Sequence, residues 1–315
     1  AQAGQFMVYA DARPGVDQNE LAAALDAEIA RFIAEGPTAD ELQRATTTYA
    51  AGEIRGLEQV GGFNGKAPTL AQGLLYSGNP AEYREVLQAA AAMTPERVRE
   101  VTARWLSRPV FALTVEPGDR QEGGEHRGGF FTGAEAGSGG LTGPAFYSGP
   151  FAMQAAAAAA EADRSSLPEV GELKPLDFPD IERATLSNGM EVFFARRDAV
   201  PTVSVRVNFD AGYSADPKDR LGTQSLMLSL MDEGTRRLDS TALAIARERL
   251  GASLYASADA DTTSVGLDAL APNLAPSLEL MAEYIRHPAF DPQELERVRA
   301  RQLTRIQNEL NNPGA

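Results

Sequence analysis

The chain has 315 residues, which at roughly 100–200 residues per domain predicts two domains. Hydrophobic residues make up 43% and charged residues 23%, close to the globular average, which excludes wholesale disorder and favours a sizeable core. Acidic residues outnumber basic ones by 44 to 29, and the net charge of −15 argues against a nucleic-acid partner. No apolar run reaches the ~18 residues of a spanning helix, so no membrane span is expected. The absence of cysteine excludes disulfides and thiolate metal sites.

Residues 1–116 predict a first module of five helices between two strands, Phe6–Ala10 and Val110–Val115. Thr38 with Glu41 three residues later forms the pattern of a capping box, and a Pro that follows Thr94 is a second helix-start signal. The five helices are expected over about 18–34, 38–58, 67–77, 81–91 and 95–107.

Residues 117–182 predict a linker. They carry 11 acidic and 4 basic residues, eleven glycines between Gly118 and Gly149, and the alanine run Ala155–Ala160. Such a composition offers few large apolar groups to offset the entropy of ordering the chain. Five aromatic residues lie between Phe130 and Phe151, so we expect part of this segment to lie on a module surface; a recognition loop is the alternative reading.

Residues 183–315 predict a second module of strands and helices. Asn188-Gly189 is typical of a two-residue hairpin between strands at 184–186 and 190–194. From Val203 onward apolar and polar residues alternate, which predicts a strand with one buried face. Further helices are expected at about 219–232, 240–250, 274–287 and 291–310, and further strands at 254–257 and 264–270.

A shift of 253 residues superposes the first two helices of the first module on the last two of the second without a gap. Leu21 then matches Leu274, and the capping Thr38 matches Asp291. Chance agreement between two helical hairpins is the alternative to duplication, since Leu and Glu are common helix residues. Duplication predicts one α+β domain type for two related modules, each with helices packed on a largely antiparallel sheet.

The residues alone indicate no catalytic constellation. A zinc site needs three or four His, Cys or carboxylate ligands, and the two histidines, His126 and His287, lie far apart in the sequence. We interpret His126 as a solvated loop residue and His287 as a helix-terminal residue before a proline. Asp259 and Asp261 are typical of a hairpin tip. The glycine pairs lack the Lys-Ser/Thr that follows a phosphate loop.

The second module carries an ordered set of recognisable motifs. In chain order they are ATLSNGMEVFF (184–194), PTVSVRVNFDAG (201–212), LGTQSLMLSLMDEGT (221–235), LGASLYASAD (250–259) and PAFDPQELER (288–297). Together they closely resemble the start of a domain of the pitrilysin/insulinase family of zinc metallopeptidases, which includes the mitochondrial processing peptidases. In that family four similar α+β domains form two halves that enclose a peptide-degrading chamber and are joined by a linker.

The resemblance implies that residues 183–315 are the N-terminal part of an inactive-half domain. Residues 1–116 are similar, less sharply, to the C-terminal part of a first-half domain, and 117–182 lie where the linker belongs, although their glycine-rich stretch departs from the family pattern. Both modules would then be incomplete. Because the first expected strand starts almost at the N-terminal residue, we expect a piece of a longer polypeptide.

The family's metal motif is an inverted H-x-x-E-H on a helix, with a third ligand, a glutamate, on a later helix. The matching positions here are Ser225, Leu228 and Ser229, and the third ligand falls near Arg305. Two hydroxyls, a leucine and a cation replace the ligands and the base. We therefore expect no catalytic, cofactor-binding or metal residue in this segment, and zinc only in a catalytic domain upstream of Ala1.

The resemblance implies a non-catalytic part of a two-half zinc metalloendopeptidase that degrades or processes peptides, with this segment helping to build the chamber. One alternative is a non-enzymatic scaffold or core-type subunit of the same fold, and another is a module that captures peptides on sheet edges. Expected partners are the rest of its own polypeptide or a catalytic half, and peptide substrates. An exported, periplasmic location in a bacterium is the expectation for such a protein.

Two further expectations concern packing. Ser225 and Ser229 should be core-facing hydroxyls that bond the carbonyl one helical turn back. Incomplete modules would expose strand edges and apolar faces, so we expect either a composite domain, in which the two modules pack on one another, or an aggregation-prone fragment.

Overall fold

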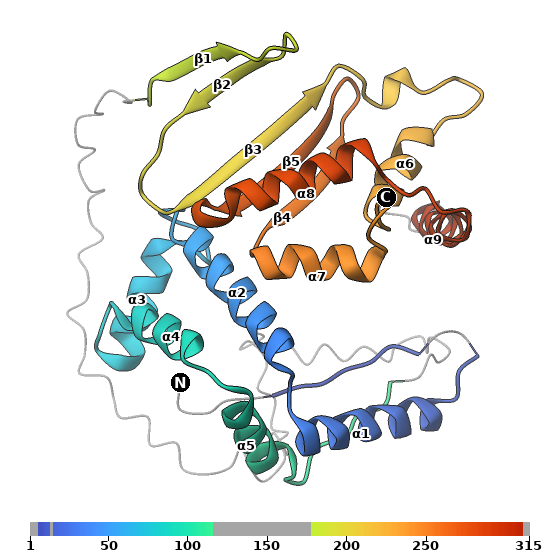
Figure 1. Cartoon of the computed structure of the whole chain (residues 1–315). Helices are drawn as coiled ribbons and strands as arrows, with labels where there is room; N and C mark the ends of the chain where they lie inside the picture. The colour runs from blue at the N-terminus through green and yellow to red at the C-terminus, as the bar shows by residue number, and fades with distance from the viewer. Residues whose placement is uncertain (1–5, 13–14, 116–177, 311–315) are drawn as a thin grey trace, which may run out of the picture. The chain divides into compact units, whose positions relative to one another are not determined.

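The computed structural model describes residues 6–12, 15–115 and 178–310, and the following description refers to these residues (Figure 1). Residues 1–112 and 181–315 form one compact unit, the arrangement that the composite alternative describes. The second unit, Leu113–Asp180, lies almost wholly outside the described residues, as do most of the expected linker and its aromatic side chains. Of the helices described, none combines the length and the apolar character needed to cross a membrane.

The five helices expected in the first module are confirmed. Thr38 accepts a hydrogen bond from the backbone N–H of Glu41, whose carboxylate accepts one from the N–H of Thr38, so the capping box is complete. The Thr94 side chain caps the fifth helix by accepting a hydrogen bond from the backbone N–H of Arg97, and proline occupies the first helical position. The helices are α1 (Gln18–Glu35), α2 (Ala39–Gly56), α3 (Lys66–Ser77), α4 (Glu82–Ala91) and α5 (Pro95–Leu106).

The two strands expected in the first module, Phe6–Ala10 and Val110–Val115, are wrong. Both segments are irregular and exposed, and neither pairs with another described segment. An isolated strand leaves its backbone N–H and C=O groups without partners, so the local pattern alone does not produce one. Within the described residues the first module is therefore helical.

The second module opens with an antiparallel hairpin of β1 (Ile181–Thr185) and β2 (Glu191–Ala195). Its turn corrects the expected two-residue loop, because the backbone N–H of Leu186 bonds the carbonyl of Met190 and leaves three residues between them. Gly189 closes the turn with a φ of 87°, a left-handed conformation that glycine adopts without strain.

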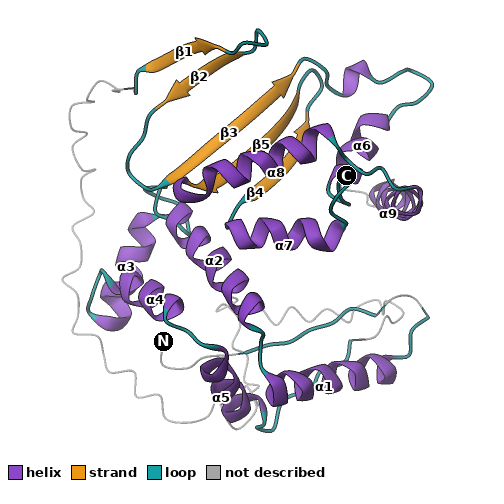
Figure 2. Ribbon diagram, viewed as in Figure 1, coloured by secondary structure: helices purple, strands orange, loops and turns teal. Residues whose placement is uncertain are grey.

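Three further strands form an antiparallel sheet in the order β3-β5-β4 (Figure 2). Four helices follow or connect these strands, and α6 begins later than the sequence predicts because Asp216 accepts hydrogen bonds from the backbone N–H groups of Gly222 and Gln224. The strands are β3 (Thr202–Phe209), β4 (Ser253–Ala258) and β5 (Thr263–Leu270). The helices are α6 (Thr223–Met231), α7 (Ser240–Leu250), α8 (Leu274–Arg286) and α9 (Pro292–Leu310), with short 3-10 turns at Tyr213–Ala215 and Ala271–Asn273.

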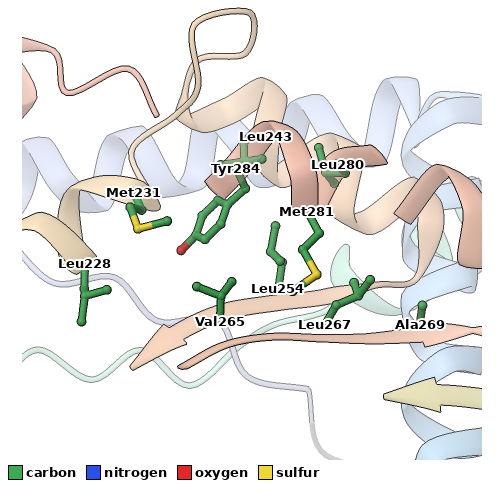
Figure 3. Packing of buried hydrophobic residues seen from close by; sticks show 10 residues of the cluster. All are labelled: Leu228, Met231, Leu243, Leu254, Val265, Leu267, Ala269, Leu280, Met281 and Tyr284. Carbon is green, nitrogen blue, oxygen red and sulfur yellow. The ribbon is translucent and has the colours of Figure 1, made fainter. Parts of the chain in front are cut away.

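The core lies between one face of this sheet and the helices α6, α7 and α8 (Figure 3). Alternate residues of β5 supply its floor: Val265, Leu267 and Ala269 are each at most 2% exposed. This period of two is the pattern of a strand with one buried face. The helices add Leu228, Met231, Leu243, Leu280, Met281 and Tyr284, and β4 adds Leu254.

The opposite face of the sheet is polar. Ser204 donates a hydrogen bond to Asp268 at 2.6 Å, and Ser264 donates one to Asn208 at 2.7 Å. Tyr255 lies across Gly266, where an added Cβ would come within 2.2 Å of the tyrosine ring. The described chain is thus α+β, with helices packed on an antiparallel sheet and its strands confined to 181–310.

The two helix pairs related by the 253-residue shift have similar bounds. Shifted by 253, α2 would span 292–309, and α9 spans Pro292–Leu310. Asp291 accepts a hydrogen bond from the backbone N–H of Gln293, so it caps α9 as Thr38 caps α2. These bounds agree with duplication, which stays a prediction.

Truncation of the core should destabilise the fold far more than truncation at the surface. Leu267 is 1% exposed, so Leu267→Ala is expected to lower the free energy of unfolding by about 2–5 kcal/mol. Leu278→Ala is the control, because Leu278 is 39% exposed, and it should cost less than about 1 kcal/mol. Denaturant unfolding followed by circular dichroism measures both, and equal losses would contradict the assigned core.

Candidate functional site

Helix α6 carries Ser225, Leu228 and Ser229, the three positions that the sequence resemblance aligns with the family's metal motif. Leu228 is 7% exposed and belongs to the core, while Ser225 and Ser229 are partly buried. The Ser229 hydroxyl donates to the carbonyl of Ser225 at 3.0 Å, which confirms the expected bond to the preceding turn. Ser225 differs from the expectation, because its hydroxyl oxygen accepts a hydrogen bond from the Gln302 side-chain amide at 2.9 Å.

Helix α9 meets α6 through Gln302, one turn before Arg305. Arg305 is 63% exposed in its side chain and pairs with Glu309 on its own helix at 3.8 Å. At the other end of the contact, Glu233, just beyond α6, pairs with Arg297 and with Arg301. The two helices therefore run antiparallel, and an amide lies beside the first motif position.

This group of side chains does not fit a catalytic zinc. Zinc in proteins is held by imidazole, thiolate or carboxylate groups, whereas Ser225, Ser229 and Gln302 offer two hydroxyls and an amide. Leu228 has no group that could take a proton from water. Among the residues that the structure describes, no cluster of three or more His, Cys, Asp or Glu side chains could hold a metal ion.

The other candidates from the sequence have structural roles where they are described. His287 ends α8: its backbone N–H bonds the carbonyl of Glu283, and its carbonyl accepts from the backbone N–H of Arg236. Asp259 lies at the tip between β4 and β5 and accepts hydrogen bonds from two backbone N–H groups, those of Thr262 and Asp261, which lower the pKa of its carboxyl. His126 lies outside the described residues.

The structure adds a polar cluster that the sequence does not indicate, formed by Asp232, Arg247 and Tyr284. Tyr284 is 0% exposed, and its hydroxyl donates to Asp232 at 3.1 Å. The Arg247 guanidinium donates to the same carboxylate at 2.8 Å and lies 5.4 Å from the centre of the tyrosine ring. Burial, and then the charge of Asp232, raise the pKa of Tyr284. The cluster joins the end of α6 to α7 and α8.

Comparison with known proteins gives one family match and several structural ones. Residues 192–313 match the family model described as Insulinase (Peptidase family M16). No curated protein matches the chain.

Two solved structures are similar to part of the chain. One is the crystal structure of a peptidase M16 inactive domain from Pseudomonas fluorescens, 28% identical over 43% of this chain and 33% of that one, with a TM-score of 0.41. The other is a protease from Helicobacter pylori, 24% identical over 39% of this chain and 30% of that one, with a TM-score of 0.36. The chain thus spans about a third of the length of the structures it matches.

A zinc site engineered on α6 should need position 302 rather than position 305. Ser225→His with Ser229→His places two imidazoles one turn apart, and Gln302→Glu adds a carboxylate where the amide now contacts Ser225. We expect this triple variant to bind Zn²⁺ at least about tenfold more tightly than the double variant, by titration calorimetry. The matched variant carries Arg305→Glu in place of Gln302→Glu. Tighter binding by that variant would contradict the α6–α9 register.

The buried tyrosine should make stability depend on pH above its ordinary pKa. Because the folded chain raises the pKa of Tyr284, the unfolded chain loses this proton first, and the free energy of unfolding should fall as pH rises above about 10. Tyr284→Phe should cost about 1 kcal/mol at neutral pH and make the alkaline decline shallower. Denaturant unfolding at pH 8 to 11 tests this, with Tyr76→Phe, at a 65% exposed position, as control. An unchanged decline in Tyr284→Phe would refute the assignment.

Proposed function

We propose, because residues 192–313 match the insulinase family (peptidase family M16), that this chain is a non-catalytic part of a two-half zinc metalloendopeptidase. Its role is to build part of the chamber in which peptides are degraded or processed. The catalytic half, on the same or another polypeptide, would hold the zinc that activates water for peptide hydrolysis.

The observation that carries the proposal is the chemistry of α6. This helix lies inside the matched segment, and at the positions that the resemblance aligns with the family's metal motif it carries a core leucine and two serines. Ser229 is engaged with its own helix and Ser225 with Gln302. The helix is integrated into the fold as a packing element, which suits an inactive half.

The polar face of the sheet supports a role as a chamber wall. Ser204, Arg206 and Asn208 alternate along β3, are exposed, and lie on the side away from the core helices. A hydrated chamber needs a wall that remains in contact with water on one side and buries its apolar groups on the other. The three-stranded sheet has this division.

A second candidate is peptide capture without cleavage. In the described part of the chain β3 and β4 are the outer strands of the sheet, so each presents one edge to which an extended peptide could add. A scaffold subunit of the same fold would likewise carry α6 as a packing helix without metal ligands. These alternatives differ from the main proposal in whether zinc-dependent cleavage occurs in the assembly that contains this chain.

The experiment is to isolate the native assembly through an affinity tag on this chain. Its zinc content and its phenanthroline-sensitive cleavage of an unstructured peptide are then measured. We expect zinc and cleavage in the assembly, and unchanged cleavage when this chain carries Ser225→Ala with Ser229→Ala. An assembly without zinc and without cleavage would refute the enzyme reading and favour a scaffold. Loss of cleavage in the double variant would place catalysis on α6 and overturn the proposal.

A further inference from the structure

Helix α2 of the first module packs closely on the end of α7 in the second. Ala51, in the C-terminal half of α2, is 0% exposed, although α2 otherwise presents no buried residue. Gly251 ends α7 with a φ of 59°, and an added Cβ would lie 3.0 Å from the Ala51 Cβ and 3.1 Å from the Thr47 methyl. Small residues on both sides therefore let the two backbones approach.

Arg55 joins the same two segments. From the last turn of α2 its guanidinium donates to the Ser253 hydroxyl at 2.9 Å and to the carbonyl of Gly251. Carbonyl groups at the end of a helix lack partners within the helix and carry a partial negative charge. A cation from α2 thus supplies the cap at the end of α7.

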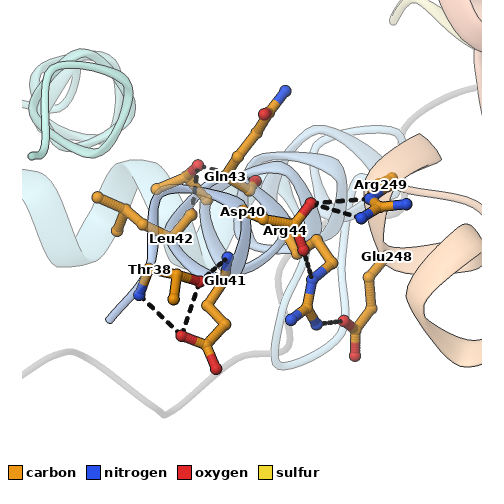
Figure 4. Close-up of polar contacts among 9 residues, drawn as sticks. Thr38, Asp40, Glu41, Leu42, Gln43, Arg44, Glu248 and Arg249 are labelled. Carbon is orange, nitrogen blue, oxygen red and sulfur yellow. Dashed lines mark hydrogen bonds and ion pairs between the residues drawn. The ribbon is translucent and has the colours of Figure 1, made fainter. Parts of the chain in front are cut away.

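Four charged residues alternate in sign across the contact (Figure 4). Arg44 pairs with Asp40 on its own helix at 2.9 Å and with Glu248 of α7. Arg249 of α7 pairs with Asp40 at 2.8 Å. The Arg44 side chain is only 18% exposed, so its charge is shielded from water more than that of an ordinary surface pair. Hydrogen bonds from Arg249 and then Arg44 lower the pKa of Asp40.

We propose that α2 and α7 form an intramolecular latch that holds residues 1–112 on residues 181–315 without help from the chain that connects them. We call the seven residues the α2–α7 latch: Asp40, Arg44, Ala51, Arg55, Glu248, Arg249 and Gly251. The partner of α7 is α2 of the same chain, because the two helices are complementary in shape and charge and because Arg55 of α2 caps the end of α7. The latch uses neither zinc nor peptide, so it is independent of the proposed function.

The direct test cuts the full chain. A protease site is inserted between residues 117 and 182, the purified protein is cut, and native mass spectrometry with size-exclusion chromatography measures the products. We expect the two fragments to remain in one 1:1 complex at micromolar concentration and to separate more readily in 1 M salt, which screens the ion pairs. Two separate fragments at low salt would overturn the proposal.

Charge reversal tests the residues. Arg44→Glu places a negative charge beside Asp40 and Glu248 and should raise the dissociation constant of the cut fragments at least about tenfold. Arg44→Glu with Glu248→Arg restores one pair and should recover most of this loss. The matched control is Arg31→Glu, because Arg31 pairs only with Glu28 and Glu35 of its own helix among the described residues, and it should change the constant less than about threefold. Equal effects of the two single variants would contradict the latch.

A crosslink tests whether positions 44 and 248 lie side by side, whatever the affinity of the cut fragments for each other. The sequence has no cysteine, so Arg44→Cys with Glu248→Cys gives the only two thiols for a short bis-maleimide. After linker cleavage, the crosslinked fragments should run as one chain-sized band on a denaturing gel, and those of Arg31→Cys with Glu248→Cys as two. A band of twice the chain mass before cleavage would show that α2 docks on a second copy, and would overturn the intramolecular assignment.

Discussion

Burial of one face of the three-stranded sheet is the constraint on which the second module depends. Val265 and Leu267 project from β5 into a cluster that only α6, α7 and α8 cover among the described elements. Helix α6 is therefore fixed by Leu228 and Met231, which pack in that cluster, and by Asp232 at its end. Its position needs no metal. The packing of α6 thus rests on apolar contacts and one polar cluster rather than on metal ligands, and a fold alone does not establish an activity.

The helices and one hairpin of this fold could be predicted because their signals are local. Thr38 and Glu41 lie three residues apart and form the capping box within one turn. The strands expected near residues 6–10 and 110–115 failed for the opposite reason, since a strand is completed only by a partner whose position the local sequence does not specify. The Asn188-Gly189 pattern predicts the position of the hairpin but not the length of its loop, because that length depends on the backbone of the flanking residues.

In the candidate site, too, the local features could be predicted from the sequence, whereas the contacts between distant residues could not. That α6 carries no imidazole could be read from Ser225 and Ser229 directly. The contact of Ser225 with Gln302 joins residues 77 positions apart, and that of Asp232 with Tyr284 joins residues 52 apart. No periodicity relates such pairs, because they depend on how helices pack. The α2–α7 latch is a third case, with Arg44 and Glu248 separated by 204 positions. It joins a helix of the first module to a helix of the second.

The zinc content of the purified chain tests most directly whether α6 is a packing element without a metal. The protein would be equilibrated with excess Zn²⁺, passed through a desalting column and analysed by inductively coupled plasma mass spectrometry. We expect far less than one zinc per chain, with no change in Ser225→Ala/Ser229→Ala. One tightly held zinc per chain that this double variant loses would contradict it.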